Sequence, residues 1–147
     1  MSGPVSLEAV ALAYLARREH SRAELRLKLI AKGGEPHDVD ALLDRLADRR
    51  LLSEERFIEG LVHRRAGRFG AARIRQELRS HQLDPEHIEA SVAALRATEF
   101  DRAREVWRKR FREPSASRED KLRQMRFLAS RGFSAEVVRR VLGGGDD

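Results

Sequence analysis

Apolar residues recur along this chain at the three- and four-residue spacing of amphipathic helices. The clearest single stripes are those of Val39, Leu42, Leu43 and Leu46, of Ile88, Val92 and Leu95, and of Val137, Val138, Val141 and Leu142. Capping residues and glycines separate the stripes, and together they predict helices at residues 5–18, 21–32, 36–50, 53–67, 70–82, 85–97, 99–112, 117–131 and 134–143. We therefore expect these stripes to form the core.

The pattern repeats at a shift of 49 residues, so that Leu25 and Leu29 correspond to Ile74 and Leu78. A third, looser copy places Leu128 where the second copy has Leu78. Three tandem three-helix repeats are predicted, at residues 1–51, 52–98 and 99–143, followed by a tail at 144–147. Units of this size do not bury their apolar faces alone, which indicates stacking into an elongated array.

The predicted helix ends carry their own chemistry. Ser21 and Glu24 have the spacing of a capping box, and Gly33 supplies a glycine exit for the same helix. Pro36 occupies a first helical position, where its missing N–H costs nothing. The second repeat has Gln82 where the first has Gly33, and we expect a stiffer joint there.

Composition supports an all-α class, because Ala, Leu, Arg and Glu dominate and the 147 residues include only one Tyr and one Trp. The chain has no Cys, so a disulfide, a thiolate zinc site and a Cys nucleophile are all excluded. No apolar run approaches the length of a membrane-spanning helix, and there is no signal-peptide pattern; we expect a cytoplasmic protein without membrane contact.

Catalytic and cofactor chemistry is not predicted. The five His residues lack metal-ligand spacing and are expected to face solvent or cap helices, so no metal site is assigned. No glycine-rich phosphate loop is present, and no cofactor is expected. Trp107 could stack on a base, but it shares a helix stripe with Ala103, Val106 and Phe111, which favours a place in the core.

The formal charge is +6 and the isoelectric point is about 10.6, which favours a polyanionic partner. Basic residues concentrate at 17–32, 61–81 and 102–112, whereas the third helices at 35–48 and 84–97 are acidic. A single exposed arginine is usually only part of a solvated surface, but recurrence at equivalent places indicates a binding surface. If equivalent helices line up in the stack, one edge of the array is a basic ridge and another edge is an acidic ridge. The candidate contact residues are Arg22, Arg26, Lys28, Lys32, Arg64, Arg65, Arg68, Arg73, Arg75, Arg79, Arg108, Lys109, Arg110 and Arg112.

Three segments resemble the successive signatures of the RecX regulatory proteins. They run from Ser21-Arg-Ala-Glu-Leu25 to Gly33, from Arg64 to Leu78, and from Lys121 to Ser134. The Arg126-Phe127-Leu128-Ala-Ser-Arg131-Gly-Phe-Ser134 element is the most specific of these. The likeness covers nearly the whole chain.

The resemblance implies a long, curved protein of tandem three-helix repeats that is not an enzyme. It implies a negative regulator of the RecA recombinase, acting in recombination, repair and the SOS response. Such a protein binds the RecA–single-stranded-DNA filament and suppresses its extension, ATP hydrolysis, strand exchange and coprotease activities. The expected partners are the RecA filament and single-stranded DNA, the latter without sequence preference because phosphate contacts do not read bases. A monomer is expected.

Two other interpretations stay open. A three-helix unit can resemble a helix-turn-helix DNA binder, although a recognition helix should be basic and the third helices here are acidic. The chain could also be a helical-repeat scaffold for a protein partner, with its basic ridge unrelated to nucleic acid.

Overall fold

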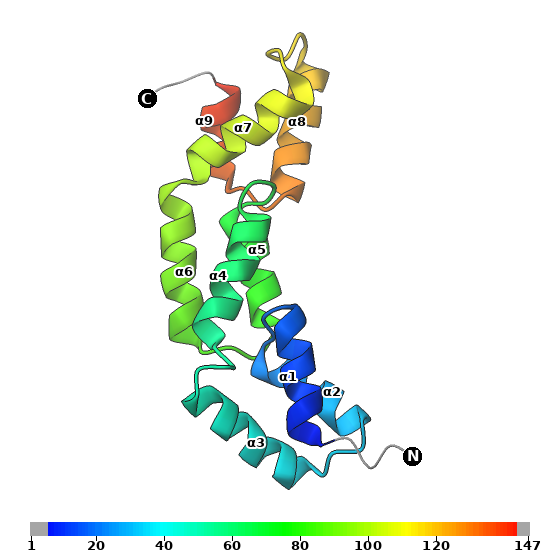
Figure 1. Ribbon diagram of the computed structural model, residues 1–147. Coiled ribbons are helices and arrows are strands. Elements are labelled where there is room, and N and C mark those ends of the chain that lie inside the picture. The colour runs from blue at the N-terminus through cyan, green and yellow to red at the C-terminus, as the bar shows by residue number, and fades with distance from the viewer. Residues whose placement is uncertain (1–5, 144–147) are drawn as a thin grey trace. The chain divides into compact units, whose positions relative to one another are not determined.

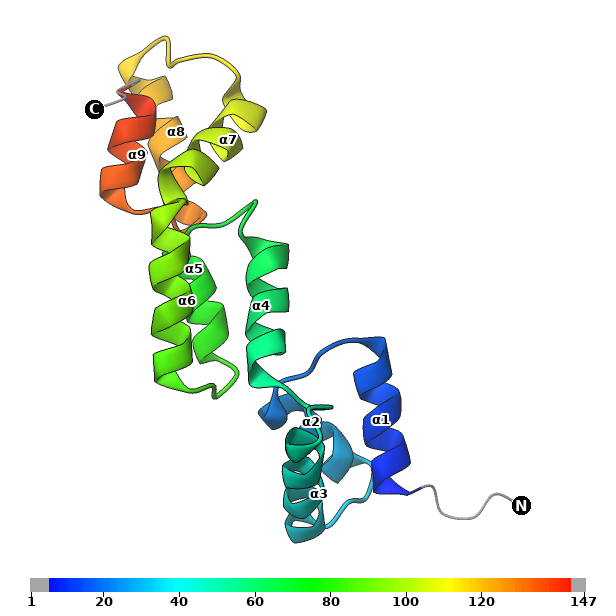
Figure 2. The same ribbon diagram turned by 60° about the vertical axis from the view of Figure 1, so that its left-hand side comes forward.

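The computed structural model describes residues 6–143, and these residues form nine helices and no strand (Figures 1 and 2). The helices are α1 (Leu7–Arg17), α2 (Arg22–Ala31), α3 (Pro36–Asp48), α4 (Glu54–Arg65), α5 (Ala71–Arg79), α6 (Pro85–Ala97), α7 (Glu99–Phe111), α8 (Arg118–Ser130) and α9 (Ala135–Leu142). The all-α class is confirmed, and each helix lies where the pattern predicted it. The predicted helix start at residue 5 and the predicted tail at 144–147 lie outside the described residues.

The chain divides into two compact units. Unit 1 contains the chain through Gly60 together with His81–Leu83, and unit 2 contains Leu61–Ser80 and the chain from Asp84 onward. The repeat boundaries expected at 51/52 and 98/99, and the curvature of the array, stay predictions.

The core of unit 1 lies among α1, α2 and α3. Its fully buried side chains are Ala11, Leu25, Leu29, Val39, Leu42, Leu43, Leu46 and Leu52. Tyr14 and Leu15 of α1 pack against this cluster from its edge. The predicted stripe of α3 is therefore the buried face of that helix.

Unit 2 buries two sets of apolar side chains. α5 packs on α6, which buries Ile74, Leu78, Ile88, Val92 and Leu95. α7, α8 and α9 surround Ala103, Leu128, Phe133, Val138 and Val141. Trp107 packs against this second cluster and donates its indole N–H to the buried Gln124 at 2.8 Å, so its predicted place in the core is confirmed.

Helix ends follow the predicted chemistry with one substitution. Ser21 and Glu24 form the capping box, with both reciprocal hydrogen bonds present. At the exit of α2, Gly33 has a φ of +97°, and at the exit of α8, Gly132 has a φ of +90°. Gln82 occupies the equivalent left-handed position after α5 with a φ of +55°. All three helices are thus followed by a left-handed residue, although the one after α5 is Gln82 and not glycine, the residue that adopts this conformation most easily.

Candidate nucleic-acid interface

The fourteen basic residues predicted to contact a polyanion divide between the two units. Unit 1 holds Arg22, Arg26, Lys28 and Lys32. Unit 2 holds Arg64, Arg65, Arg68, Arg73, Arg75, Arg79, Arg108, Lys109, Arg110 and Arg112. Each set is a feature of its own unit.

In unit 1 the basic second helix and the acidic third helix pair with each other. Arg22 of α2 forms an ion pair of 2.7 Å with Asp44 of α3. Arg26 forms one of 2.8 Å with Asp40, and its guanidinium holds the pKa of that carboxyl below its ordinary value. The two cations already have anionic partners, which reduces the positive potential that they offer to a phosphate.

Lys28 lies over the ring of Tyr14, and its ammonium group is 2.9 Å from Nε2 of His20. His20 was expected to face solvent or to cap a helix; it does not face solvent, because the side chain is buried with 1% of its area exposed, and it contacts Arg18, the C-cap residue of α1. Its Nδ1 lies 3.1 Å from the carbonyl of Arg18. An imidazole that donates to a carbonyl and accepts from an ammonium group is neutral, and burial lowers the pKa of His20.

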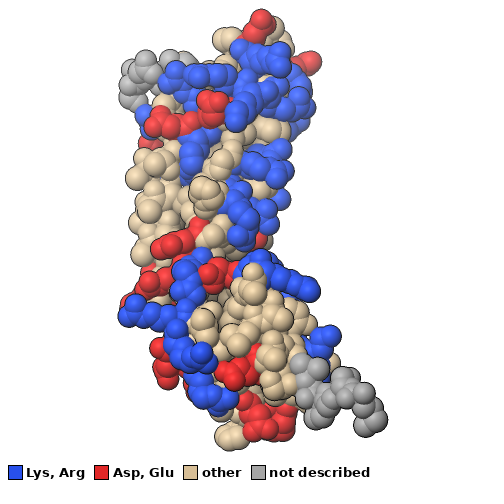
Figure 3. Space-filling model, viewed as in Figure 1, with Lys and Arg blue, Asp and Glu red and all other residues tan. Residues whose placement is uncertain are grey.

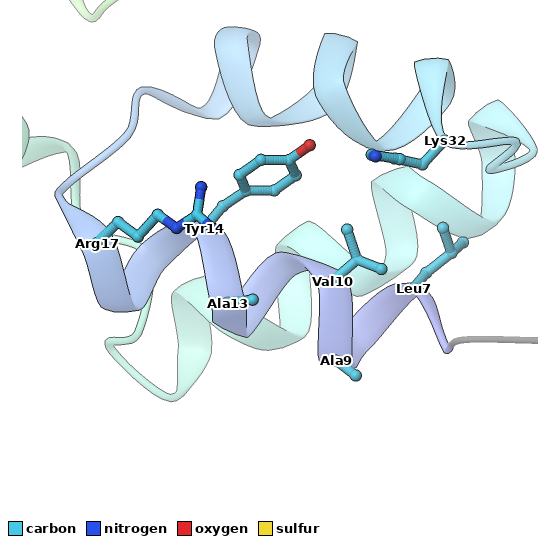
Figure 4. A pocket seen from close by; sticks show the side chains of 7 residues that line it. All are labelled: Leu7, Ala9, Val10, Ala13, Tyr14, Arg17 and Lys32. Atoms are coloured by element: carbon cyan, nitrogen blue, oxygen red, sulfur yellow. The ribbon is translucent and has the colours of Figure 1, made fainter. Parts of the chain in front are cut away.

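Lys32 and Arg17 flank a hollow of about 660 Å³ that α1 borders (Figure 4). The remaining lining is apolar or small, and it consists of Leu7, Ala9, Val10, Ala13 and Tyr14. No carboxylate or hydroxyl other than that of Tyr14 lines it, so the hollow offers little hydrogen-bonding specificity.

In unit 2, four of the ten predicted residues have a carboxylate partner. The ion pairs are Arg65–Glu77 at 3.0 Å, Arg75–Glu89 at 2.7 Å, Arg79–Glu89 at 3.6 Å and Arg108–Glu105 at 3.6 Å. Within residues 6–143 no ion pair is found for the other six, which are Arg64, Arg68, Arg73, Lys109, Arg110 and Arg112. Figure 3 shows basic side chains following one another down the right-hand side of this unit.

Arginine and phenylalanine side chains of unit 2 also alternate in a continuous series of contacts. We call the set the Arg–Phe ladder, and it consists of Arg73, Phe69, Arg131, Phe127, Arg110, Phe111 and Arg123. In that order, successive guanidinium carbons and ring centroids lie 4.2, 5.4, 4.9, 5.6, 5.4 and 5.2 Å apart. These distances are those of cation–π contacts. Phe111 and Phe127 also meet edge to face, with centroids 5.4 Å apart.

Backbone contacts hold the ladder residues in place. The N–H of Gly70 donates to the carbonyl of Arg131 at 2.8 Å, and Arg73 donates to the carbonyl of Ser130 at 3.2 Å. Arg102 of α7 donates to the carbonyls of Ala66 and Phe69, which fixes the loop between α4 and α5. Burial lowers the pKa of Arg102, which is therefore a structural arginine inside a cluster that was counted as basic.

Glu99, the first residue of α7, joins three helices. Its carboxylate is buried, with 3% of the residue exposed, and accepts from the N–H of Ala71 at 2.7 Å and from the N–H of Ser134 at 3.2 Å. Gly70, the N-cap of α5, has no side chain to cap that helix. Glu99 supplies the missing acceptor from 28 positions along the chain.

Sequence reasoning did not select Arg131, Arg123 or the three phenylalanines of the ladder. Arg131 and Phe127 belong to the most specific segment of the RecX-like signature, and that segment was the available signal. Charge counting passed over α8, in which the acidic residues Glu119 and Asp120 of the first turn offset two of the four cations.

The fold defines an all-helical protein of tandem three-helix units, and six of the candidate cations of unit 2 have no ion pair within residues 6–143. Sequence profiles of the RecX first, second and third three-helix domains match residues 9–46, 53–92 and 97–142. The chain belongs to the RecX family.

Two relatives named regulatory protein RecX illustrate the similarity. The protein of Leptothrix cholodnii is 54% identical over 94% of this chain and 88% of its own length. That of Ralstonia pickettii is 49% identical over 98% of this chain and 91% of its own length. The crystal structure of RecX from Lactobacillus salivarius shares the fold, with a TM-score of 0.79 at 18% identity over 94% of this chain and 93% of that one.

None of the described helices is long and apolar enough to cross a membrane.

Proposed function

We propose that this protein is a negative regulator of a RecA recombinase that binds the RecA–single-stranded-DNA filament. Binding suppresses filament extension, ATP hydrolysis, strand exchange and coprotease activity. The observation that carries the proposal is the match of all three RecX domains, in order, along residues 9–142. The relatives named regulatory protein RecX give the regulatory role, and the resemblance to that family gives RecA as the target.

The unpaired cations of unit 2 support a nucleic-acid component of this binding. Contacts from arginine and lysine to phosphates release counterions, so the affinity should fall steeply with salt. Such contacts position a protein on the strand without reading its sequence. The protein is thus expected to act on filaments regardless of DNA sequence, without a cofactor or a catalytic step.

The test is the ATPase activity of RecA on single-stranded DNA, measured with and without the protein across a range of salt. Inhibition at stoichiometric amounts that weakens with salt is expected. Charge reversal of Arg64 and Arg68, which are exposed, should relieve inhibition. The matched control reverses Arg45 and Arg96, two exposed cations on the acidic helices α3 and α6, and should inhibit like the unaltered protein.

Lack of inhibition by the unaltered protein would remove the regulator proposal. A footprint on duplex DNA with sequence preference would favour the helix-turn-helix interpretation instead. Filament binding that persists in high salt and without DNA would favour a scaffold whose basic surface does not contact nucleic acid.

A further inference from the structure

An open hollow of about 280 Å³ lies beside the Arg–Phe ladder. Its lining comes from the loop after α4, from α7 and from the last part of α8 with the residue that caps it. The lining residues are Gly67, Arg68, Val106, Lys109, Arg110, Phe127 and Arg131. Four of these seven are cations and none is acidic, so the hollow has the charge of an anion site.

We propose that this hollow, the ladder pocket, binds a backbone phosphate of single-stranded nucleic acid, while a neighbouring base stacks on the ladder. The inference rests on the proposed function and deepens it, because it assigns the strand to particular residues. It narrows fourteen candidate cations to a small set and adds Arg131, which charge counting did not select.

The guanidinium groups are arranged for phosphate recognition. The guanidinium carbon of Arg131 lies 4.9 Å from the ring centroid of Phe127 and 5.4 Å from that of Phe69, so it contacts two rings. Arg110 is placed similarly against Phe111 and Phe127. Stacking on the flat faces leaves the N–H edges for a phosphate, to which guanidinium donates two parallel hydrogen bonds. Holding the side chains before binding lowers the entropy lost on binding.

The aromatic half of the ladder favours a single strand over a duplex. Phe69, Phe111 and Phe127 are half-buried, so each ring retains exposed area next to an arginine. Unpaired bases stack on such aromatic and guanidinium surfaces regardless of their identity. In a duplex the bases are already stacked on each other, and only the phosphates remain available.

The pocket also has an open wall. A Cβ at Gly67 would meet no atom within 4 Å, so backbone and solvent meet there without an obstructing side chain. A flexible strand that enters at this wall meets a pocket also lined by Lys109 and Arg110, on the last turn of α7.

The first experiment measures binding of the full chain to a fluorescent oligothymidine of about 15 nucleotides, without RecA, by anisotropy across salt. The double variant Lys109→Gln/Arg110→Gln changes two exposed residues and is expected to fold. For the loss of the contact with one phosphate on a single strand, the slope of log K against log salt should fall by about 0.7. The control Arg45→Gln/Arg96→Gln, with the same charge change, should keep the slope of the unaltered protein.

A second variant separates stacking from charge. Arg131→Lys keeps the positive charge but loses the planar group that contacts the two rings. The salt slope should stay the same while the affinity falls about threefold. Circular dichroism spectra of each variant are compared with that of the unaltered protein to check that the variant is folded.

The inference is overturned if Lys109→Gln/Arg110→Gln binds with the same slope as the control, or if duplex DNA of equal phosphate content binds as tightly as the single strand. If that variant binds oligothymidine normally but no longer inhibits RecA, the pocket contacts protein; the inference fails and the proposed regulator stands. If it loses oligothymidine and still inhibits, the inference holds and the nucleic-acid component of the proposed function fails.

Discussion

At the residue scale, Glu99 has the widest structural effect in unit 2. One buried carboxylate accepts from the N–H groups of Ala71 and Ser134, at the starts of α5 and α9. Removing the Glu99 carboxylate loses two hydrogen bonds to a charged acceptor. It also leaves two backbone N–H groups unpaired, and both losses lower the free energy of unfolding. We expect Glu99→Ala to lower the free energy of unfolding by about 3 kcal/mol, measured by urea denaturation.

The control is Glu105→Ala on the same helix. Glu105 is exposed and its contact with Arg108 is 3.6 Å long, so a change within about 0.5 kcal/mol is expected. Equal destabilisation by the two substitutions would show that the loss comes from α7 itself and not from the bonds that Glu99 accepts.

Because His20 is buried, we expect the free energy of unfolding to depend on pH. Burial lowers its pKa in the folded chain, whereas the unfolded chain titrates near the ordinary value of about 6.5. The unfolded state therefore binds more protons between these two values. The contribution of His20 is complete above pH of about 6.5 and is lost as the pH falls through that value toward the folded pKa.

The measurement is the melting temperature from about pH 8 to about pH 5.5, for the unaltered protein and for His20→Gln. The unaltered protein should lose stability on acidification, and the variant should lose less over the same interval. Parallel curves for the two proteins would contradict a neutral, buried His20, whatever the variant does to stability at neutral pH.

At the element scale, equivalent helix starts use different chemistry. Ser21 caps α2 with its own hydroxyl, whereas Gly70 stands at the equivalent place before α5 and Glu99 does the capping. A Cβ at Gly70 would collide with the backbone of Gly132 and Phe133. Glycine is thus required because the α5 start lies directly against the turn between α8 and α9.

Because of this close approach, a serine at position 70, which the repeat pattern suggests would stabilise the protein, is expected to destabilise it. Gly70→Ser restores the capping residue of the first repeat, yet it should lower the free energy of unfolding by about 1 to 3 kcal/mol, because the added atoms have no room. Thermal or urea unfolding measures it. Gly67→Ser, three residues earlier and with open space around it, is the control and should stay close to the unaltered protein. A gain in stability from Gly70→Ser would disprove the packing constraint.

Helices and their ends were predictable from the sequence because their determinants are local. The stripe of α3, the Ser21–Glu24 box and the glycine exits all lie within a few residues of the structure that they specify. Gln82 adopts the same left-handed turn although the pattern has no glycine there, so the presence of glycine alone does not predict this turn. Glu99 was not predictable, because its partners lie 28 and 35 positions away.

At the scale of the whole molecule, a count of charges does not locate the charge that is free to bind. In both units cations of the basic second helix pair with the acidic third helix, through Arg22–Asp44 and Arg26–Asp40 in unit 1 and through Arg75–Glu89 and Arg79–Glu89 in unit 2. The ladder forms only when residues from α5 and the loop before it, from α7, and from α8 and its C-cap come together. Sequence spacing therefore predicted the basic clusters and could not predict which cations had partners.

Arg22 and Arg26 of unit 1 have carboxylate partners, whereas Arg68 and Arg110 of unit 2 have none within residues 6–143. Arg22→Gln/Arg26→Gln and Arg68→Gln/Arg110→Gln remove the same formal charge, but only the second pair consists of cations without an ion pair in the described chain. Removing paired cations leaves Asp40 and Asp44 without partners and disrupts few phosphate contacts. The ladder-pocket variant Arg68→Gln/Arg110→Gln should therefore lose about 0.7 from the salt slope for oligothymidine, whereas the unit 1 variant should change it by well under half of that.

Anisotropy titrations of both variants over the same salt series make this comparison, and melting temperatures check that unit 1 remains folded once two ion pairs are removed. Exposed pairs of this kind contribute about 0.2 to 1 kcal/mol each, so the unit 1 variant should remain folded at room temperature. Equal slopes for the two variants would mean that a DNA strand competes with Asp40 and Asp44 for their arginines. The basic clusters would then be equivalent, as their positions in the repeat alone suggest.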